Sequence, residues 1–426
     1  MRRIELVLLT LCIAGCTSLL PGEGQRLFTQ RRSAMVCPAA APIVRTNVPG
    51  RPFEALASGR GRWVFASLMP SGAKRKAERT GGGIAVLHWS GRQLVLRRVV
   101  PLPSIPTGMA LSHDGRLLVV ADSRDVDFLD VPRLVSGSAD PLLGSIRDAA
   151  AAGSVYAAIS VDDRTLFVSN ESVSTVTVID LQRARITGFP QDAIVGNIST
   201  GKAPVGLAVS PDGRDLFITS EFWPPGPGSP TDCRSPAGFG PARSIPAGAV
   251  EVVDIARARR RPRDAVIGWT WAGCMPVRAA LSADGARLYV TARGSNAMLA
   301  FDAARLLTHP THALLATVPV GAAPVGLAVA EQGRRIVVAD SSRFGDSGGS
   351  DLTIIDAARI VEGRAAVIGT IAAGQFPREL HKVPDGRALL LTDTDSKQIE
   401  RIPSACLASA SSRPQGATAM APHGTP

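Results

Sequence analysis

Five polar residues could do chemistry because they interrupt a short apolar segment that recurs along the chain. Three copies of the segment carry glycine at its third position: Gly108, Gly206 and Gly326. The residues that break this pattern, four at the third position and one two residues later, are Glu54, Tyr156, Arg278, Glu379 and His381. Because side chains alternate along a strand, His381 is expected on the same face as Glu379.

These residue types suit acid–base chemistry or ligand binding. Glu54 or Glu379 would act as a general base or a metal ligand, and His381 would carry a proton. Arg278 would stabilise an oxyanion or hold a carboxylate. Such a cluster in a concave place predicts a ligand site, and the alternative is an ion-pair network that fills the space structurally.

No stronger catalytic motif supports the enzyme hypothesis. The sequence contains no GxSxG elbow, Walker loop, HExxH or CxxCH motif. It also shows no nucleophile paired with a base and no full set of metal ligands. We therefore predict no cofactor and no metal, and binding is favoured over catalysis.

A sevenfold repeat contains the elements that position these residues. Its copies begin 48 to 72 residues apart, at Pro52, Pro106, Ser154, Pro204, Pro276, Pro324 and Pro377. Most copies continue with a polar turn, such as 210–214, and then with a β-rich run, such as 216–219. Asp-Gly between alternating apolar runs predicts a hairpin. Four short strands per repeat of about 50 residues predict an all-β, seven-bladed β-propeller.

The fourth strand of each repeat indicates how the ring closes. It has an eight-residue form that ends in glycine, at 194–201, 266–273, 314–321 and 367–374. The seventh repeat ends near Ile402 without such a segment, whereas 43–50 has the same form and precedes the first repeat. The N-terminal strand is therefore expected to complete the last blade, which would leave only short outer edges exposed.

Several of these segments resemble a known family. The run 201–213, GKAPVGLAVSPDG, and the strands that begin at Phe167 (FVSN) and Thr177 (TVID) are similar to the YVTN-repeat propellers, the YncE-like family. The resemblance covers roughly 43–402 and implies the fold. It implies little about function, because related seven-bladed scaffolds serve as lactonases, quinoprotein dehydrogenase subunits and binding platforms.

The N-terminus resembles that of a bacterial lipoprotein. A short basic start precedes the apolar run 6–14, and residues 13–16 (IAGC) resemble a lipobox. The resemblance implies that 1–15 is a signal peptide, that Cys16 is lipidated, and that 16–36 is a tether. Since Thr17 is not aspartate, it also implies the periplasm and the outer membrane, with the lipid as the membrane contact.

Four further cysteines fit two disulfides in an exported protein. Cys37 lies just before the closing strand and Cys406 just after the strand that it should pair with, so a bond between them would staple the ring. Cys233 and Cys274 lie in two connections of blade 4 that emerge on the same face, which predicts the second bond. The alternative, a metal site, lacks a CxxC motif or a nearby histidine.

The distribution of charge and the lengths of the loops indicate what kind of partner the protein binds and on which face. The formal net charge is +11, but the densest basic run, 257–263, is expected on the opposite face from the basic residues within 74–79. Without one continuous basic stripe, we predict no nucleic-acid binding. Three long connections, 69–83, 222–248 and 341–350, are expected on one face, where recognition usually resides.

These features lead to one functional prediction and one alternative. The propeller would occupy 37–406 and be followed by a disordered tail at 407–426. It would act without catalysis as an exported, lipid-anchored binding scaffold for a protein or cell-wall partner on the loop-rich face. The alternative is a lactonase-like or other small-molecule enzyme with its site at the top of the central channel.

Overall fold

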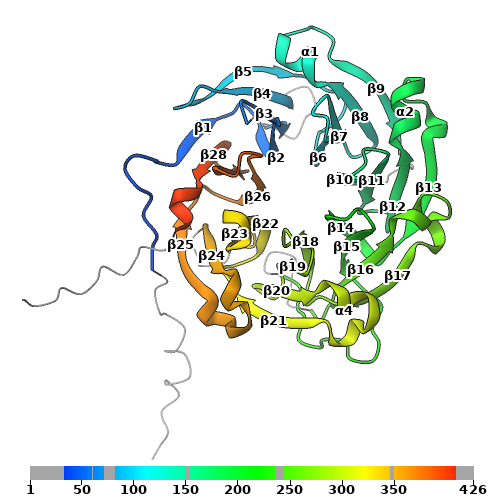
Figure 1. The fold of residues 1–426 in the computed structure, drawn as a ribbon, viewed down its shortest axis with the longest axis vertical. Coiled ribbons are helices and arrows are strands. Elements are labelled where there is room, and N and C mark those ends of the chain that lie inside the picture. The colour runs from blue at the N-terminus through cyan, green and yellow to red at the C-terminus, as the bar shows by residue number, and fades with distance from the viewer. Residues whose placement is uncertain are drawn as a thin grey trace, which may run out of the picture.

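Seven small antiparallel sheets stand around a central axis in the computed structural model (Figure 1). The structure describes residues 33–408, apart from residue 60 and the ranges 72–81, 149–152, 237–242 and 346–349. This arrangement confirms the seven-bladed propeller. The signal segment, Cys16, most of the tether, the basic residues within 74–79 and the tail from 409 lie outside the described residues.

Each blade has four strands, numbered here from the axis outward. Blades 1 to 3 are β2 (Arg51–Ala57), β3 (Trp63–Met69), β4 (Gly83–Trp89), β5 (Leu94–Val100); β6 (Met109–Leu111), β7 (Leu117–Ala121), β8 (Asp125–Asp130), β9 (Leu142–Arg147); and β10 (Ser154–Ile159), β11 (Thr165–Asn170), β12 (Thr175–Asp180), β13 (Ile194–Ser199). Blades 4 and 5 are β14 (Lys202–Val209), β15 (Asp215–Phe222), β16 (Ala249–Asp254), β17 (Val266–Trp271); and β18 (Pro276–Leu281), β19 (Arg287–Ala292), β20 (Ala297–Asp302), β21 (Leu314–Pro319). Blades 6 and 7 are β22 (Pro324–Ala330), β23 (Arg335–Asp340), β24 (Asp351–Asp356), β25 (Val367–Ala372); and β26 (Pro377–Lys382), β27 (Ala388–Asp393), β28 (Gln398–Pro403), β1 (Val44–Asn47).

Burial explains the sequence pattern of the strands. The second strand of a blade is covered on both faces by neighbouring blades, so β7 is apolar and buried at every position. The outermost strand is covered on one face only, and β13 alternates between partly buried and exposed residues until Ile198. One apolar cluster joins Val119 and Phe128 of blade 2 to Leu166 and Val168 of blade 3, so the core lies between blades.

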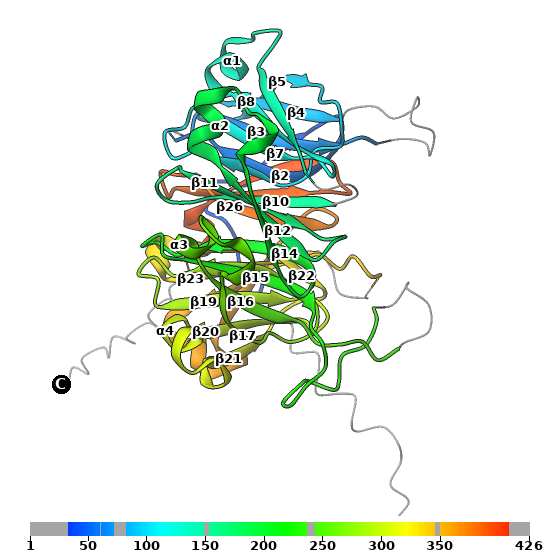
Figure 2. The same cartoon turned by 90° about the vertical axis from the view of Figure 1, so that its right-hand side faces the viewer.

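Short helices follow the third strand of four blades. They are α1 (Val131–Ser136), α2 (Leu181–Thr187), α3 (Ile255–Ala258) and α4 (Ala303–Thr308). Each begins after an aspartate whose carboxylate accepts the backbone N–H three residues on, at 2.7 Å for Asp130 and Arg133. Figure 2 shows these helices on one side of the ring and the long loop after β15 on the other. We call these two sides the helix face and the loop face.

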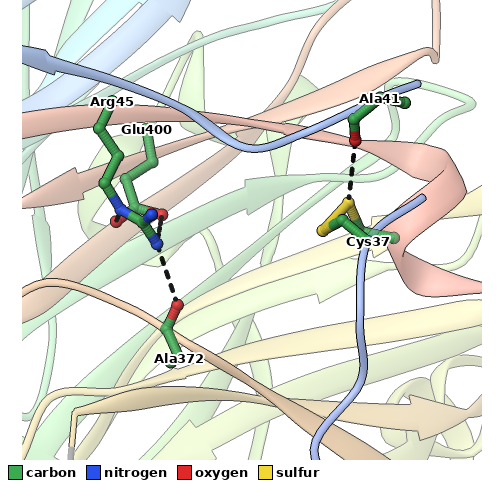
Figure 3. Close-up of a disulfide and its surroundings, with 6 residues drawn as sticks. Cys37, Ala41, Arg45, Ala372 and Glu400 are labelled. Atoms are coloured by element: carbon green, nitrogen blue, oxygen red, sulfur yellow. Dashed lines mark hydrogen bonds and ion pairs between the residues drawn. A yellow bond between two sulfur atoms is a disulfide. The ribbon is translucent and has the colours of Figure 1, made fainter. Parts of the chain in front are cut away.

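The two ends of the ring meet in blade 7, as predicted. Strand β1 pairs antiparallel with β28, and Arg45 Nε lies 2.7 Å from Glu400 Oε1. Cys37 and Cys406 form a disulfide beside this junction (Figure 3). The predicted closing strand and the predicted staple are both confirmed.

The described part of the chain begins on blade 6 before it crosses to blade 7. The Met35 N–H donates to Thr370 O at 2.8 Å, and the Thr370 N–H donates to Ser33 O at 3.1 Å. A Cβ at Gly369 would lie 2.7 Å from Ser33 O and 2.6 Å from Met35 Cγ. The segment therefore covers the outer edge of β25 at a position where only glycine leaves room for it.

The second predicted disulfide is also present. Cys233, in the connection between β15 and β16, is bonded to Cys274, in the connection that enters β18. The bond fastens the long loop of blade 4 to the loop face. Among the described residues, no helix is both long and apolar enough to cross a membrane.

Candidate functional site

The polar residues singled out in the sequence lie together on the innermost strands. Glu379 Oε1 accepts the Tyr156 hydroxyl at 2.7 Å, and its Oε2 accepts Arg278 Nε at 2.8 Å. A second Arg278 nitrogen also contacts Glu379, so this pair has two contacts. His381 Nε2 lies 2.6 Å from Glu54 Oε1, and the other Glu54 oxygen accepts the Met109 N–H.

A sixth member of this group, Arg378, was not among the residues predicted from the sequence. Its Nη2 donates to the Tyr156 hydroxyl at 3.2 Å, and its Nε lies 3.5 Å from Glu379. The equivalent position is valine in four copies of the repeat, as in Val205, so the arginine itself was an available signal. We call these six residues the channel layer: Glu54, Tyr156, Arg278, Arg378, Glu379 and His381.

The cations of the channel layer lie over aromatic rings. The Arg278 guanidinium carbon is 3.6 Å from the centre of the Tyr156 ring, and that of Arg378 is 3.8 Å from the centre of the Phe53 ring. The Phe53 and Tyr156 rings are themselves 5.2 Å apart. Cation–π contacts partly replace the water that these guanidinium groups lose on burial.

Burial and pairing set the electrostatics of the layer. Glu54 and Glu379 are 4% and 2% exposed. Burial lowers the pKa of Arg278 and of Arg378, and the charge of Glu379 opposes this in both cases. Burial alone would lower the pKa of His381, but the charge and hydrogen bond of Glu54 outweigh it and the pKa is raised. Each carboxylate of the layer is therefore matched with a cation.

One member of the layer reaches a cavity on the helix face. About a third of the His381 side chain (34%) is exposed, and it lines a cavity of about 330 Å³ with Lys382 and the inner strands of blades 5 and 6. His381 therefore faces the side of the ring opposite to the long loops. The role of the five predicted residues as a ligand site stays a prediction.

A larger cavity, of about 540 Å³, opens on the loop face. We call it the loop-face cavity. Its charged lining residues are Glu171, Glu221, Arg293, Arg343 and Arg378. Apolar walls come from Val155, Val205, Phe222, Ile245 and Met275. Arg378 belongs to both the cavity wall and the channel layer, so the layer lies directly against the bottom of this cavity.

The long loop of blade 4 is fixed where it lines the cavity. The Ile245 N–H donates to Cys233 O at 3.1 Å, beside the Cys233–Cys274 disulfide. On the outer side of the same loop, Trp223 packs against Trp269 with ring centres 4.6 Å apart. A disulfide, a backbone hydrogen bond and an aromatic contact therefore hold this part of the cavity wall in place.

Among the described residues that line the cavity, Arg293 and Glu221 form an ion pair. Arg293 Nη2 lies 2.6 Å from Glu221 Oε1, and both side chains are largely buried, at 13% and 4% exposed. Burial raises the pKa of Glu221, and the charge of Arg293 opposes this. Arg343, by contrast, has no carboxylate within ion-pair distance among the described residues.

The described residues also contain one group with metal-ligand atoms close together, at Asp232, Cys233 and Cys274. The two sulfur atoms are bonded to each other and do not form thiolate ligands. This group therefore does not fit a metal ion.

Comparisons with known proteins support the fold. No family model matches the chain, and no curated protein sequence matches it. A solved structure of hydrazine synthase from Kuenenia stuttgartiensis is similar at TM-score 0.61 and 17% identity, covering 84% of this chain and 97% of that one. A chain in a crystal structure of the mitotic checkpoint complex is similar at TM-score 0.57 and 15% identity, covering 84% and 93%. At these identities the likeness shows the propeller alone.

Proposed function

We propose that this protein is an exported, lipid-anchored propeller that acts without catalysis and holds a protein or cell-envelope partner on its loop face. The observation that carries the proposal is the loop-face cavity of about 540 Å³. This volume lies within the range of about 300 to 1,000 Å³ that is usual for ligand pockets. Its walls come from blades 3 to 7, so one partner group would touch most of the ring.

The channel layer supports binding over catalysis. Glu379 is held by Arg278 and Tyr156, and Glu54 is held by His381. A general base must be free to take a proton from a substrate within hydrogen-bond reach. Carboxylates matched in this way instead hold the inner strands of several blades together across the axis.

Propeller neighbours are compatible with this proposal. The mitotic checkpoint complex is, by its title, an assembly, and one of its chains has this fold. Rigid blades with connections of variable length on one face are a common way to present a recognition surface. The neighbour supports the kind of function and gives no indication of the partner.

Attachment to the membrane rests on the lipobox-like residues 13–16. In cells that make the full chain, Cys16→Ser should move the protein from the membrane fraction to the soluble fraction. Cys12→Ser is the matched control and should leave it in the membrane fraction. Equal fractionation of both variants would contradict the lipid anchor.

Site-specific photo-cross-linking tests the binding face. A benzophenone amino acid would replace Trp269, which is 37% exposed beside the long loop, or Ile186, which is 76% exposed in α2 on the helix face. We expect a discrete cross-linked species from position 269 and none from position 186. Cross-linking from position 186 alone, or from neither position, would contradict a partner on the loop face.

A second candidate function, a lactonase-like enzyme, is favoured by one contact. The 2.6 Å approach of His381 to Glu54, with His381 open to the helix-face cavity, would orient His381 as a proton carrier. This function predicts hydrolysis of lactones by the full chain that is lost in His381→Gln. Equal rates in the two proteins would exclude this residue as the proton carrier.

A further inference from the structure

Two phenylalanine rings lie between the three arginines that line the loop-face cavity. The guanidinium carbons of Arg293 and Arg343 lie 5.8 and 5.4 Å from the centre of the Phe344 ring. Those of Arg343 and Arg378 lie 5.2 and 5.6 Å from the centre of the Phe376 ring. Three cations from blades 5, 6 and 7 are thus spaced by two rings around one cavity.

The cavity is lined by three arginines but by only two described carboxylates, Glu171 and Glu221. Glu221 is paired with Arg293, and Glu379 contacts both Arg278 and Arg378. Arg343 has no carboxylate partner among the described residues. Phenylalanine faces hold a guanidinium in place without neutralising it, so the described lining of the cavity keeps an excess of one positive charge.

The pKa of Arg343 reflects the same imbalance. Part of its side chain remains exposed, yet burial of the rest and the charges of Arg293 and Arg378 lower its pKa to about 10. The nearest opposing charges, Glu221 and Glu171, do not offset this. An anion between Arg343 and Arg378 would reduce the repulsion between them and accept hydrogen bonds from Arg343, which has no carboxylate partner in the described part of the chain.

We propose that the loop-face cavity binds an oxyanion, a carboxylate or a phosphate, that is carried on an apolar body. The oxyanion would lie between Arg343 and Arg378. The body would pack on the opposite wall, where Val155, Val205, Ile245 and Met275 supply apolar surface. This inference rests on the proposed function, since it names the chemical group of the partner that enters the same cavity.

Binding of four matched naphthyl compounds to the purified full chain tests the proposal by calorimetry. The compounds share one apolar body and differ in the group that they carry: 2-naphthoate, 2-naphthyl phosphate, 2-naphthamide and 2-naphthylmethylammonium. We expect one or both oxyanions to bind at least tenfold more tightly than the amide, and the ammonium compound to bind most weakly. The tighter of the two oxyanions identifies the head group.

Substitutions of single arginines test whether the oxyanion binds in the loop-face cavity. Arg343→Gln should weaken oxyanion binding at least tenfold, and Arg343→Lys should weaken it less because the charge remains. Arg343 lies in an exposed connection, so the fold should survive. Arg257→Gln, an exposed arginine on the helix face, is the matched control and should leave binding within twofold of wild type.

Two results would overturn the proposal. One is that neither oxyanion binds more tightly than the amide. The other is that Arg343→Gln binds the oxyanions as wild type does. Cross-linking from position 269 can succeed whatever these titrations show, so failure of this inference is distinguishable from failure of the proposed function.

Discussion

The charged side chains of the channel layer lose their contacts with water on burial and gain ion pairs and hydrogen bonds with one another. Burying an ion pair costs desolvation, and only good geometry with further hydrogen bonds compensates for that cost. Glu379 has this geometry, because it accepts hydrogen bonds from Arg278 and Tyr156 while it is almost fully buried. Replacing only Glu379 or only Arg278 should therefore reduce the free energy of unfolding more than replacing both.

A double-mutant cycle on Arg278 and Glu379 measures this. Glu379→Leu leaves Arg278 buried without its acid and should reduce the free energy of unfolding by about 3 to 5 kcal/mol. Arg278→Met combined with Glu379→Leu should cost less than the sum of the two single variants. Urea unfolding gives the values, and strictly additive losses would show that the pair is not coupled.

Buried acids elsewhere in the blades predict how stability depends on pH. Burial and the charge of Glu400 raise the pKa of Asp393 to about 8, and burial and Asp127 raise that of Asp122 to about 7. A raised folded-state pKa contributes stability below the unfolded value of about 4, and this is lost as pH rises through the folded value. Tm should therefore fall between pH 5 and pH 8.

Asp393→Asn checks the origin of this slope. The amide cannot ionise, so Tm should fall less steeply with pH than in wild type. Asp192→Asn, at an exposed position, should keep the wild-type slope. A Tm that rises across this range, or an Asp393→Asn slope equal to wild type, would contradict the pKa shift.

Strands and turns were the most predictable elements, because their causes are local. The number of blades was predictable from the alternating apolar residues and the Asp-Gly turns. The closing strand was predictable because 43–50 has the form of a fourth strand and precedes the first repeat. The glycine that ends several outermost strands has a visible cause at Gly321, where a Cβ would lie 2.4 Å from the Asp340 carboxyl carbon. Both disulfides also followed from where the connections emerge.

The loop-face cavity was not predictable in the same way. Arg293 and Arg343 come from connections between second and third strands, whose paths no sequence period determines. Their approach to Arg378 depends on the rings of Phe344 and Phe376 that lie between them. The long connections predicted from the sequence include Arg343, within 341–350, but the sequence did not single out these arginines.

Removing each disulfide in turn tests how much each one contributes to the free energy of unfolding. The chain separations are 369 residues for Cys37–Cys406 and 41 for Cys233–Cys274, so the entropic model makes loss of the first costlier by about 2 kcal/mol. Urea unfolding of the two serine double variants should show this order. Exchange of the amides in β1 should rise only in the Cys37→Ser/Cys406→Ser variant. The reverse order would mean that the long loop, and not the closure, limits stability.

Under the proposed function, the two faces of the whole molecule have different roles, structural support on one and recognition on the other. Closure by β1 removes the free edge that an open ring would present, and the helix face carries the repeated capped turns. The loop face carries the irregular connections, the second disulfide and the larger cavity. The channel layer lies between the two faces, so the proposed partner on the loop face would lie above carboxylates that are already paired with cations.

One experiment distinguishes recognition on the loop face from recognition in the channel. It measures cross-linking from position 269 in a protein in which the buried pair of Arg278 and Glu379 has been replaced. The Arg278→Met/Glu379→Leu variant would carry the benzophenone at this position, and its thermal unfolding would confirm that the ring is folded. We expect the cross-linked species to form with the wild-type yield, because the partner contacts the loops and the cavity wall. Loss of the species from a folded variant would contradict this and make the channel layer itself the site of recognition.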